Sequence, residues 1–255
     1  MSHVADDWES HWTDYASSAE QNPAQAWRRK LVIEALSAGP SATIIDIGSG
    51  QGDFARDLLR VRPDVAFHGL ELSVSGVEKS RTKVPAGHFH QVDLLASTQP
   101  IPELERLGDV LVCTEVLEHV DEPALLLASA VRYGRPGAQV LVTVPGGPRT
   151  AFDRHIGHRR HYTRVAFREL LTTSGLEVES VEAAGFPFFN LYRAVVFARG
   201  SKLIEDVGSQ ALGTAASPAT AFALKAFSRL FRLNRPTGRL GWQLIAIARV
   251  PEPST

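Results

Sequence analysis

Residues 43–53, TIIDIGSGQGD, join a short β-branched run to a glycine-rich loop and then to the start of an amphipathic stretch. The run predicts a buried strand, and the stretch that follows predicts a helix. Glycines between them let the backbone turn tightly and let a ligand approach the main chain without a Cβ in the way. A strand, a glycine loop and a helix in this order indicate the start of an α/β fold with a binding loop.

The same alternation of β-branched runs and amphipathic segments continues along the chain, which is typical of βαβ units and a largely parallel sheet. Strands are expected at Thr43–Ile47, Val65–Glu71, His88–Val92, Asp109–Cys113, Gln139–Val144, Leu176–Ala183 and Trp242–Val250. Helices are expected at Asp53–Val61, Val74–Lys83, Pro123–Tyr133 and Arg164–Ser174, the last stopped by Gly175.

Two regions lie outside this alternation. Residues 1–38 carry Trp8, Trp12 and Tyr15 at helical spacing and then a helix from about Pro23 to Ser37, and we expect them to form an N-terminal helical lid. Residues 186–241 are far longer than a hairpin connection needs, so a helical cap is expected there, with helices over Phe186–Arg199 and Phe222–Leu233. The prediction is one domain, 1–255, with its core at 40–185 and 242–250.

Composition excludes several classes of protein. The chain has 255 residues, 44% hydrophobic and 22% charged, which is globular rather than disordered. With 27 basic and 28 acidic residues there is no general basic field, so DNA is not an expected partner and RNA is disfavoured. A single cysteine, no signal-like N-terminus and no apolar stretch long enough for a bilayer predict a cytoplasmic chain.

The loop itself has the form D-x-G-x-G-x-G, with Asp46, Gly48, Gly50 and Gly52 at the named positions. A dinucleotide fingerprint is not met, because Asp53 stands where its third glycine would be. The loop resembles the first motif of the class I S-adenosylmethionine methyltransferases. That resemblance implies a Rossmann-like seven-stranded sheet with helices on both faces, and S-adenosylmethionine as the cofactor, with its amino-acid end near Asp46.

Two further acids stand at strand ends where that family has them. Glu71 ends the second expected strand, where a carboxylate can bind both ribose hydroxyls, and Asp93 follows the third, where the resemblance implies a contact with the adenine amino group. The full set of cofactor residues implied is Asp46, Gly48, Ser49, Gly50, Gly52, Glu71, Leu72, Asp93, Leu94 and Thr114.

A possible metal site follows the fourth strand, in the stretch TEVLEHV at 114–120. Placed on one helical turn, Glu115, Glu118 and His119 would share a face at the carboxyl edge of the sheet. Two carboxylates crowded together repel unless a divalent cation or a protonated His119 lies between them. One short helix cannot complete a coordination shell, so a further ligand must come from elsewhere in the chain.

Residues 153–164, DRHIGHRRHYTR, hold three of the nine histidines and open onto the same edge. The pattern E-x-x-E-H with a downstream histidine resembles the metal set of the small-RNA 3′-terminal 2′-O-methyltransferases, and the ubiquinone-pathway O-methyltransferases share EVLEHV. This resemblance implies Mg²⁺, with Mn²⁺ as the alternative, held by Glu115, Glu118, His119 and His158. The competing interpretation is a solvated or anion-binding loop.

These features predict a metal-assisted O-methyltransferase acting on a hydroxyl with a neighbouring oxygen, with a sugar or saccharide acceptor expected first. His119, His155 or His161 would accept the proton. Candidate substrate contacts are Trp8, Trp12, Tyr15, Arg154, Tyr162 and Phe186.

Three alternatives remain open: a quinone or phenol methyltransferase at a membrane surface, an RNA ribose 2′-O-methyltransferase and a noncatalytic cofactor-binding module. The membrane alternative rests on Lys225, Arg229 and Arg232, which recur at i, i+4 and i+7 opposite apolar residues. The same cap could instead close over the acceptor or form a homodimer interface.

Overall fold

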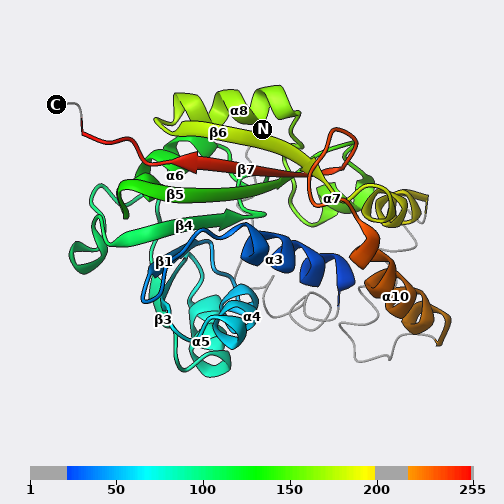
Figure 1. Cartoon of the computed structure of the whole chain (residues 1–255), viewed down its shortest axis with the longest axis horizontal. Coiled ribbons are helices and arrows are strands. Elements are labelled where there is room, and N and C mark those ends of the chain that lie inside the picture. The colour runs from blue at the N-terminus through cyan, green and yellow to red at the C-terminus, as the bar shows by residue number, and fades with distance from the viewer. Residues whose placement is uncertain (1–21, 199–217, 254–255) are drawn as a thin grey trace.

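Seven strands form one sheet in the order β3-β2-β1-β4-β5-β7-β6 (Figure 1). The computed structural model describes residues 22–198 and 218–253. Its strands are β1 (Thr43–Ile47), β2 (Ala66–Glu71), β3 (His88–Gln91), β4 (Gly108–Thr114), β5 (Gly134–Pro145), β6 (Glu177–Ala184) and β7 (Gln243–Arg249). Strands β1 to β5 are parallel, whereas β7 lies between β5 and β6 and is antiparallel to both. This is the Rossmann-like sheet that the sequence predicts.

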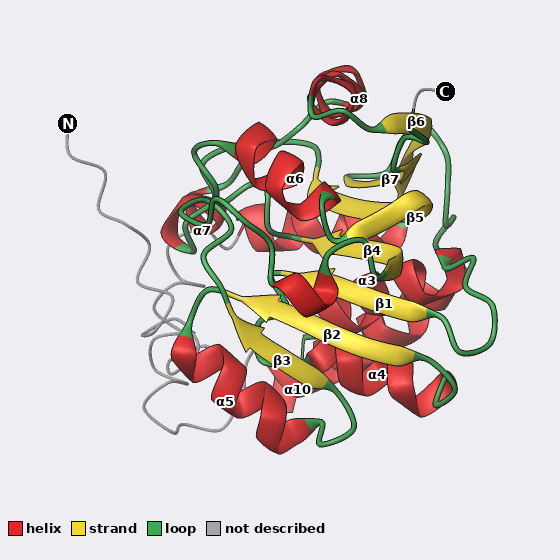
Figure 2. Cartoon of the chain, turned by 90° about the vertical axis from the view of Figure 1, so that its left-hand side faces the viewer, coloured by secondary structure: helices red, strands yellow, loops and turns green. Residues whose placement is uncertain are grey.

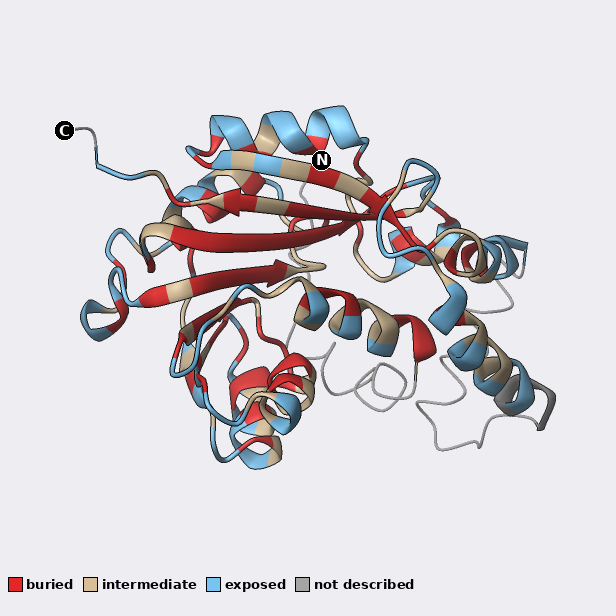
Figure 3. Ribbon diagram, viewed as in Figure 1, coloured by how far each residue is buried: buried red, intermediate tan, exposed pale blue. Residues whose placement is uncertain are grey.

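Helices cover both faces of the sheet (Figure 2). The helices are α3 (Pro23–Ala35), α4 (Asp53–Val61), α5 (Val74–Lys83), α6 (Pro123–Val131), α7 (Ala151–His155), α8 (Arg164–Thr173) and α10 (Pro218–Leu230), with 3-10 turns η1 (Pro102–Leu104) and η2 (Phe231–Leu233). Residues 188–198 are also helical. One core joins α3, α4 and α5 to the sheet, and another joins α6 and α8 to its other face. The strands are accordingly the most buried layer (Figure 3).

Local chemistry explains where the helices begin and end. The hydroxyl of Ser73 accepts from the Gly76 amide and begins α5, and that of Thr163 accepts from the Ala166 amide and begins α8. Helix α8 stops at Gly175, as predicted, because glycine adopts the left-handed conformation there (φ +86°). The Leu176 amide then donates to the Leu171 carbonyl, which completes the terminal turn.

The described parts of the N-terminal and cap regions pack on the core and on each other. Helix α3, which the sequence analysis assigns to a lid, buries Val32 in the core between the sheet and α4. The cap forms a small aromatic cluster with α3, in which Trp27 contacts Phe189 and Phe231. The predicted aromatic face at Trp8, Trp12 and Tyr15 lies outside the described residues. Within the described ranges, no helix is both long enough and apolar enough to span a membrane.

Candidate active site

The glycine loop between β1 and α4 is held against the neighbouring strand. The amides of Gly48 and Ser49 both donate to the Leu70 carbonyl, at 2.8 and 3.1 Å. Gly48 has φ +72°, and a Cβ there would come within 2.6 Å of a Val116 methyl group. Glycine is therefore required at this position both for the backbone conformation and for the close approach.

Glu71, at the end of β2, is hydrogen-bonded to that loop. Its carboxylate accepts hydrogen bonds from the amides of Gly50 at 2.8 Å and Ser73 at 3.0 Å. Burial raises the pKa of Glu71, and these backbone donors oppose that rise. The carboxylate that the resemblance assigns to the ribose thus lies at the loop, at the carboxyl edge of β1 and β2.

Asp46 lies beneath the same loop and is almost fully buried. Its Oδ1 has no hydrogen-bond partner among the described residues, and neither does the buried hydroxyl oxygen of Ser49. Burial, and then repulsion from Glu71, raises the pKa of Asp46 well above its usual range. Buried polar atoms without partners indicate a site that a ligand completes, and a ligand with an ammonium group and hydroxyls fits them.

The other predicted cofactor residues follow β2, β3 and β4 at this edge. Asp93 is exposed, and its Oδ1 accepts from the Leu95 and Ala96 amides. Leu72 is exposed, Leu94 is buried and Thr114 is the last residue of β4. Their contacts with a cofactor stay predictions.

The segment after β4 corrects one prediction. Residues 117–119 form a turn rather than a helix, and Glu115 has a left-handed backbone (φ +56°) with its amide bonded to the Thr143 carbonyl. Glu115, Glu118 and His119 therefore do not share one helical face, and that prediction was wrong. Glu115 extends the hydrogen bonding between β4 and β5 by one residue before the chain turns. Residues 115–119 are therefore not on one helix, as the prediction assumed.

Glu115 is held by residues from three other elements. Its Oε1 accepts from the Thr143 hydroxyl at 3.0 Å and from Gln243 Nε2 at 2.7 Å. Its Oε2 pairs with Arg28 Nε of α3 at 3.2 Å, and that Nε also donates to the Gln243 side chain at 2.7 Å. Arg28 and Gln243 were missed from the sequence, because no local pattern connects α3 and β7 to this turn.

Glu118, His119 and His158 form a cluster whose ligand atoms all lie within 4.8 Å of one another. Glu118 is fully buried, and neither of its carboxylate oxygens has a hydrogen-bond partner in the described chain. Burial and the nearby Glu115 raise its pKa well above the usual range. A buried carboxylate without donors is costly unless a cation pairs with it, so these oxygen and nitrogen atoms fit a divalent cation. Glu115 is not in this cluster, and its role as a ligand stays a prediction.

A chain of hydrogen bonds fixes which nitrogen of His158 is available. His161 Nδ1 lies 3.2 Å from the Gly147 carbonyl, which can only accept, so Nδ1 carries the proton. His161 Nε2 then accepts from His158 Nδ1 at 3.1 Å. The lone pair of His158 Nε2 is left facing Glu118 Oε1, 3.9 Å away. Burial and His119 hold the pKa of His158 far below its usual range, which keeps the ring neutral and able to bind a cation.

Asp153 and Arg193 form an ion pair beside His158 and His161. Two guanidinium nitrogens of Arg193, in helical segment 188–198, donate to the two Asp153 oxygens at 2.8 Å each. Asp153 is fully buried, also caps α7 through Thr150, and lies 3.9 Å from His158 Nδ1 and 3.8 Å from His161 Nε2. Arg193 lowers the pKa of Asp153 despite its burial. Sequence reasoning missed Arg193, which sits in the apolar cap segment.

The remaining predicted residues are spread around this site. His155 and Arg154 are exposed on α7, and Phe186 is half-buried. Tyr162 is buried and donates its hydroxyl to the Leu117 carbonyl at 3.1 Å, which gives it a structural role in holding the turn. The two ring nitrogens of His161 both face hydrogen-bond partners, so the geometry gives it a positioning role.

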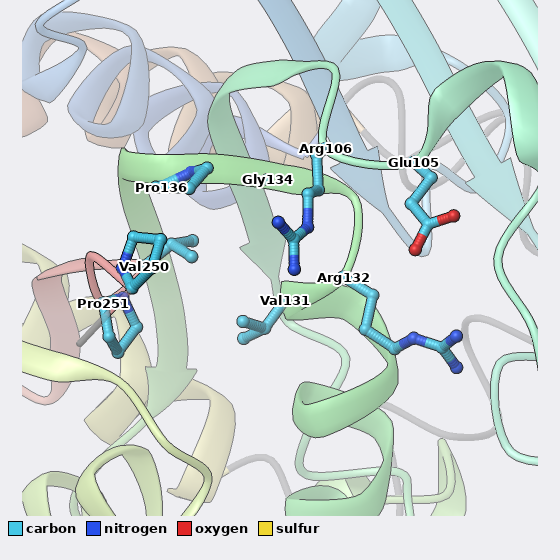
Figure 4. A pocket seen from close by; sticks show the side chains of 9 residues that line it. Glu105, Arg106, Val131, Arg132, Gly134, Pro136, Val250 and Pro251 are labelled. Atoms are coloured by element: carbon cyan, nitrogen blue, oxygen red, sulfur yellow. The ribbon is translucent and has the colours of Figure 1, made fainter. Parts of the chain in front are cut away.

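A separate cavity of about 290 Å³ lies at the opposite edge of the sheet, beside the start of β5 and the end of β7 (Figure 4). It is lined by Glu105, Arg106, Val131, Arg132, Gly134, Pro136, Val250, Pro251 and Pro253. None of the predicted site residues that the structure describes lines it. Ligands of open α/β sheets bind at the carboxyl ends of the strands, so the glycine-loop edge is the candidate site.

Comparison with known sequences agrees with this placement. The methyltransferase domain family matches residues 19–181, which include the glycine loop, the Glu118 turn and the histidine loop. The chain belongs to the methyltransferase domain family. It spans about half the length of the curated relatives it matches.

Relatives of this methyltransferase-family chain differ in their acceptors. It is 29% identical over 139 residues to trans-aconitate 2-methyltransferase of Methylobacterium nodulans, covering 54% of this chain and 50% of that protein. It is 27% identical over 124 residues to ubiquinone biosynthesis O-methyltransferase of Pseudomonas paraeruginosa, covering 45% and 50%. Among solved structures, the chain is similar to one from the complex between the Haloferax volcanii Trm112 methyltransferase activator and a methyltransferase. The TM-score is 0.64 at 16% sequence identity, and the alignment covers 99% of this chain and 100% of that one.

Proposed function

We propose that this chain transfers a methyl group from S-adenosylmethionine to a hydroxyl that has a neighbouring oxygen, with a divalent cation at the Glu118 cluster. The observation that carries the proposal is the buried Glu118 carboxylate, which has no hydrogen-bond partner among the described residues and lies next to His158 Nε2 on the same sheet edge as the glycine loop. Family membership supports the methyl transfer, and the cluster supports the hydroxyl acceptor.

The chain's own residues would bind and orient both reactants. Asp46, Glu71 and the loop backbone would hold the cofactor, which supplies an electrophilic methyl group. Glu118, His119 and His158 would hold Mg²⁺ or Mn²⁺, which lowers the pKa of a bound hydroxyl and directs its oxygen. His161, by donating to Gly147 and accepting from His158, keeps the His158 lone pair aimed at the cluster. His155, exposed on α7 and not a member of the Glu118 cluster, is the histidine that we propose as the proton acceptor.

The cofactor assignment is tested by Glu71→Ala. Loss of a charged hydrogen-bond acceptor should weaken binding of S-adenosylhomocysteine by about 1.5–3 kcal/mol, roughly 10-fold to 150-fold in Kd, measured by calorimetry. Glu78→Ala, an exposed carboxylate of α5, is the matched control and should leave the affinity unchanged. An unchanged affinity for Glu71→Ala would remove the ribose assignment, and binding of NAD instead would overturn the cofactor.

The acceptor class is a second part of the proposal. A cation held by three side chains keeps positions open for two substrate oxygens, so a sugar diol is the first candidate. Comparable turnover on paired acceptors with and without the neighbouring oxygen would argue against it.

A quinone or phenol acceptor at a membrane is the second candidate, favoured by the exposed Phe222 beside Lys225, Arg229 and Arg232. Against it, apolar side chains of α10 and η2 are already occupied, because Phe227 of α10 and Phe231 of η2 pack on Tyr192. We therefore expect no salt-sensitive flotation of the protein with anionic liposomes. Flotation that is strong at low salt and lost at high salt would favour the membrane candidate.

A further inference from the structure

Three histidines lie together on the outer two strands of the sheet, separate from the Glu118 cluster. His68 is on β2, and His88 and His90 are on β3, which pairs with β2 (Figure 2). Phe67 and Phe89, which directly precede His68 and His90, point into the core shared with α4 and α5. Because side chains alternate along a strand, all three imidazoles project from the opposite face. His88 is exposed, and His68 and His90 are half-buried.

One pair of ring nitrogens has the spacing of metal ligands, whereas the three rings together do not offer three ligand atoms within 4.8 Å of one another until His88 turns. The ring centre of His68 lies 5.1 Å from that of His88 and 5.6 Å from that of His90. His68 Nδ1 and His90 Nε2 are 3.3 Å apart. Two nitrogens each about 2.0–2.1 Å from one tetrahedral ion are about 3.3 Å apart, so the spacing of this pair needs little change to share an ion.

We propose that His68, His88 and His90 bind a transition-metal ion of the Zn²⁺ class on the open face of β2 and β3. His68 and His90 provide the closely spaced pair, and exposed His88 turns from its stacking contact to provide the third nitrogen. On binding, the ring that donates in the His68–His90 hydrogen bond would change tautomer through solvent, so that its proton lies on its other nitrogen and both neutral rings offer a lone pair to the ion. The fourth position stays with water, and Glu103 of η1 adds a negative charge near His90.

The chemistry of the cluster agrees with this choice of ion. Within residues 22–198 and 218–253 no carboxylate is in direct contact with the three imidazoles, and such a set suits Zn²⁺, Ni²⁺ or Co²⁺ and not Mg²⁺. The site formed by His68, His88 and His90 and the Glu118 cluster are therefore distinguishable by the ion that each prefers.

The test uses the full chain with Glu118→Gln and His158→Gln, so that the other cluster no longer binds metal. Calorimetric titration of this variant with Zn²⁺ should still show one equivalent bound, and Mg²⁺ at tenfold excess should not compete. Adding His68→Gln or His90→Gln should weaken the Zn²⁺ affinity at least tenfold. Adding exposed His88→Gln should weaken it too without moving the melting temperature of the metal-free protein, which separates ligand loss from misfolding. His155→Gln, another exposed histidine, is the control and should leave the affinity unchanged.

Two results would overturn the proposal. The first is loss of all Zn²⁺ binding in the Glu118→Gln, His158→Gln variant. The second is an unchanged affinity when His68 and His90 are both replaced in a variant whose melting curve remains cooperative.

Discussion

Replacing Arg193 with methionine is expected to lower the free energy of unfolding by about 3–5 kcal/mol. The substitution preserves most of the side-chain volume but leaves the Asp153 carboxylate fully buried without its bidentate partner. Removal of one member of a buried pair leaves an uncompensated charge, which is the main source of the loss. Urea denaturation followed by far-ultraviolet circular dichroism measures it.

Lys30→Met is the matched control for that experiment. Lys30 pairs with Glu34 at 3.5 Å on the exposed face of α3, with both side chains more than half exposed. Such surface pairs contribute at most about 1 kcal/mol. A loss for Arg193→Met no larger than the loss for Lys30→Met would show that Asp153 is not the buried charge described above.

Removal of divalent metal is expected to abolish methyl transfer, and Mg²⁺ or Mn²⁺ is expected to restore it. His158→Ala should raise the barrier by about 3 kcal/mol, roughly 150-fold in turnover, because the proposed cation would stabilise charge on the acceptor oxygen. S-adenosylmethionine affinity should be nearly unchanged, because under this proposal the cluster would act on the acceptor rather than on the cofactor. Turnover assays with and without EDTA, beside calorimetry with the cofactor, separate the two effects.

An isosteric pair of variants sharpens this prediction. Glu118→Gln removes a buried carboxylate charge from the cluster, whereas Glu105→Gln removes an exposed one at the opposite edge of the sheet. Only the first should reduce turnover. Full turnover in excess EDTA, or full turnover of both Glu118→Gln and His158→Ala, would contradict the metal site.

The sheet was largely predictable because each strand and helix carries its own local signal. The β-branched run at Thr43–Ile47 and the helix at Asp53–Val61 have the predicted bounds, and Gly175 stops α8 as expected. The antiparallel insertion of β7 between β5 and β6 is not encoded locally, since an alternating pattern does not specify which neighbours a strand takes.

The site was only partly predictable. Glu118, His119 and His158 are brought together as the pattern indicates, but the assumed helix was wrong because Glu115 extends the pairing of β4 with β5. Arg28, Gln243 and Arg193 reach the site from distant parts of the chain. Their contribution depends on tertiary packing, and no spacing rule applied to one segment could have identified them.

The residues that hold Glu115 also determine which part of the fold forms last. Arg28 comes from the first described helix and Gln243 from the strand that is last in the chain, so their hydrogen bond closes a loop of nearly the whole domain. Contacts between residues so far apart in sequence form late, because closing the loop costs conformational entropy before the contacts can stabilise the fold. During synthesis, the parallel strands can pair while β5 still lacks its outer neighbour. We therefore expect the carboxyl edge to become ordered for catalysis only in the final folding step, when β7 enters the sheet.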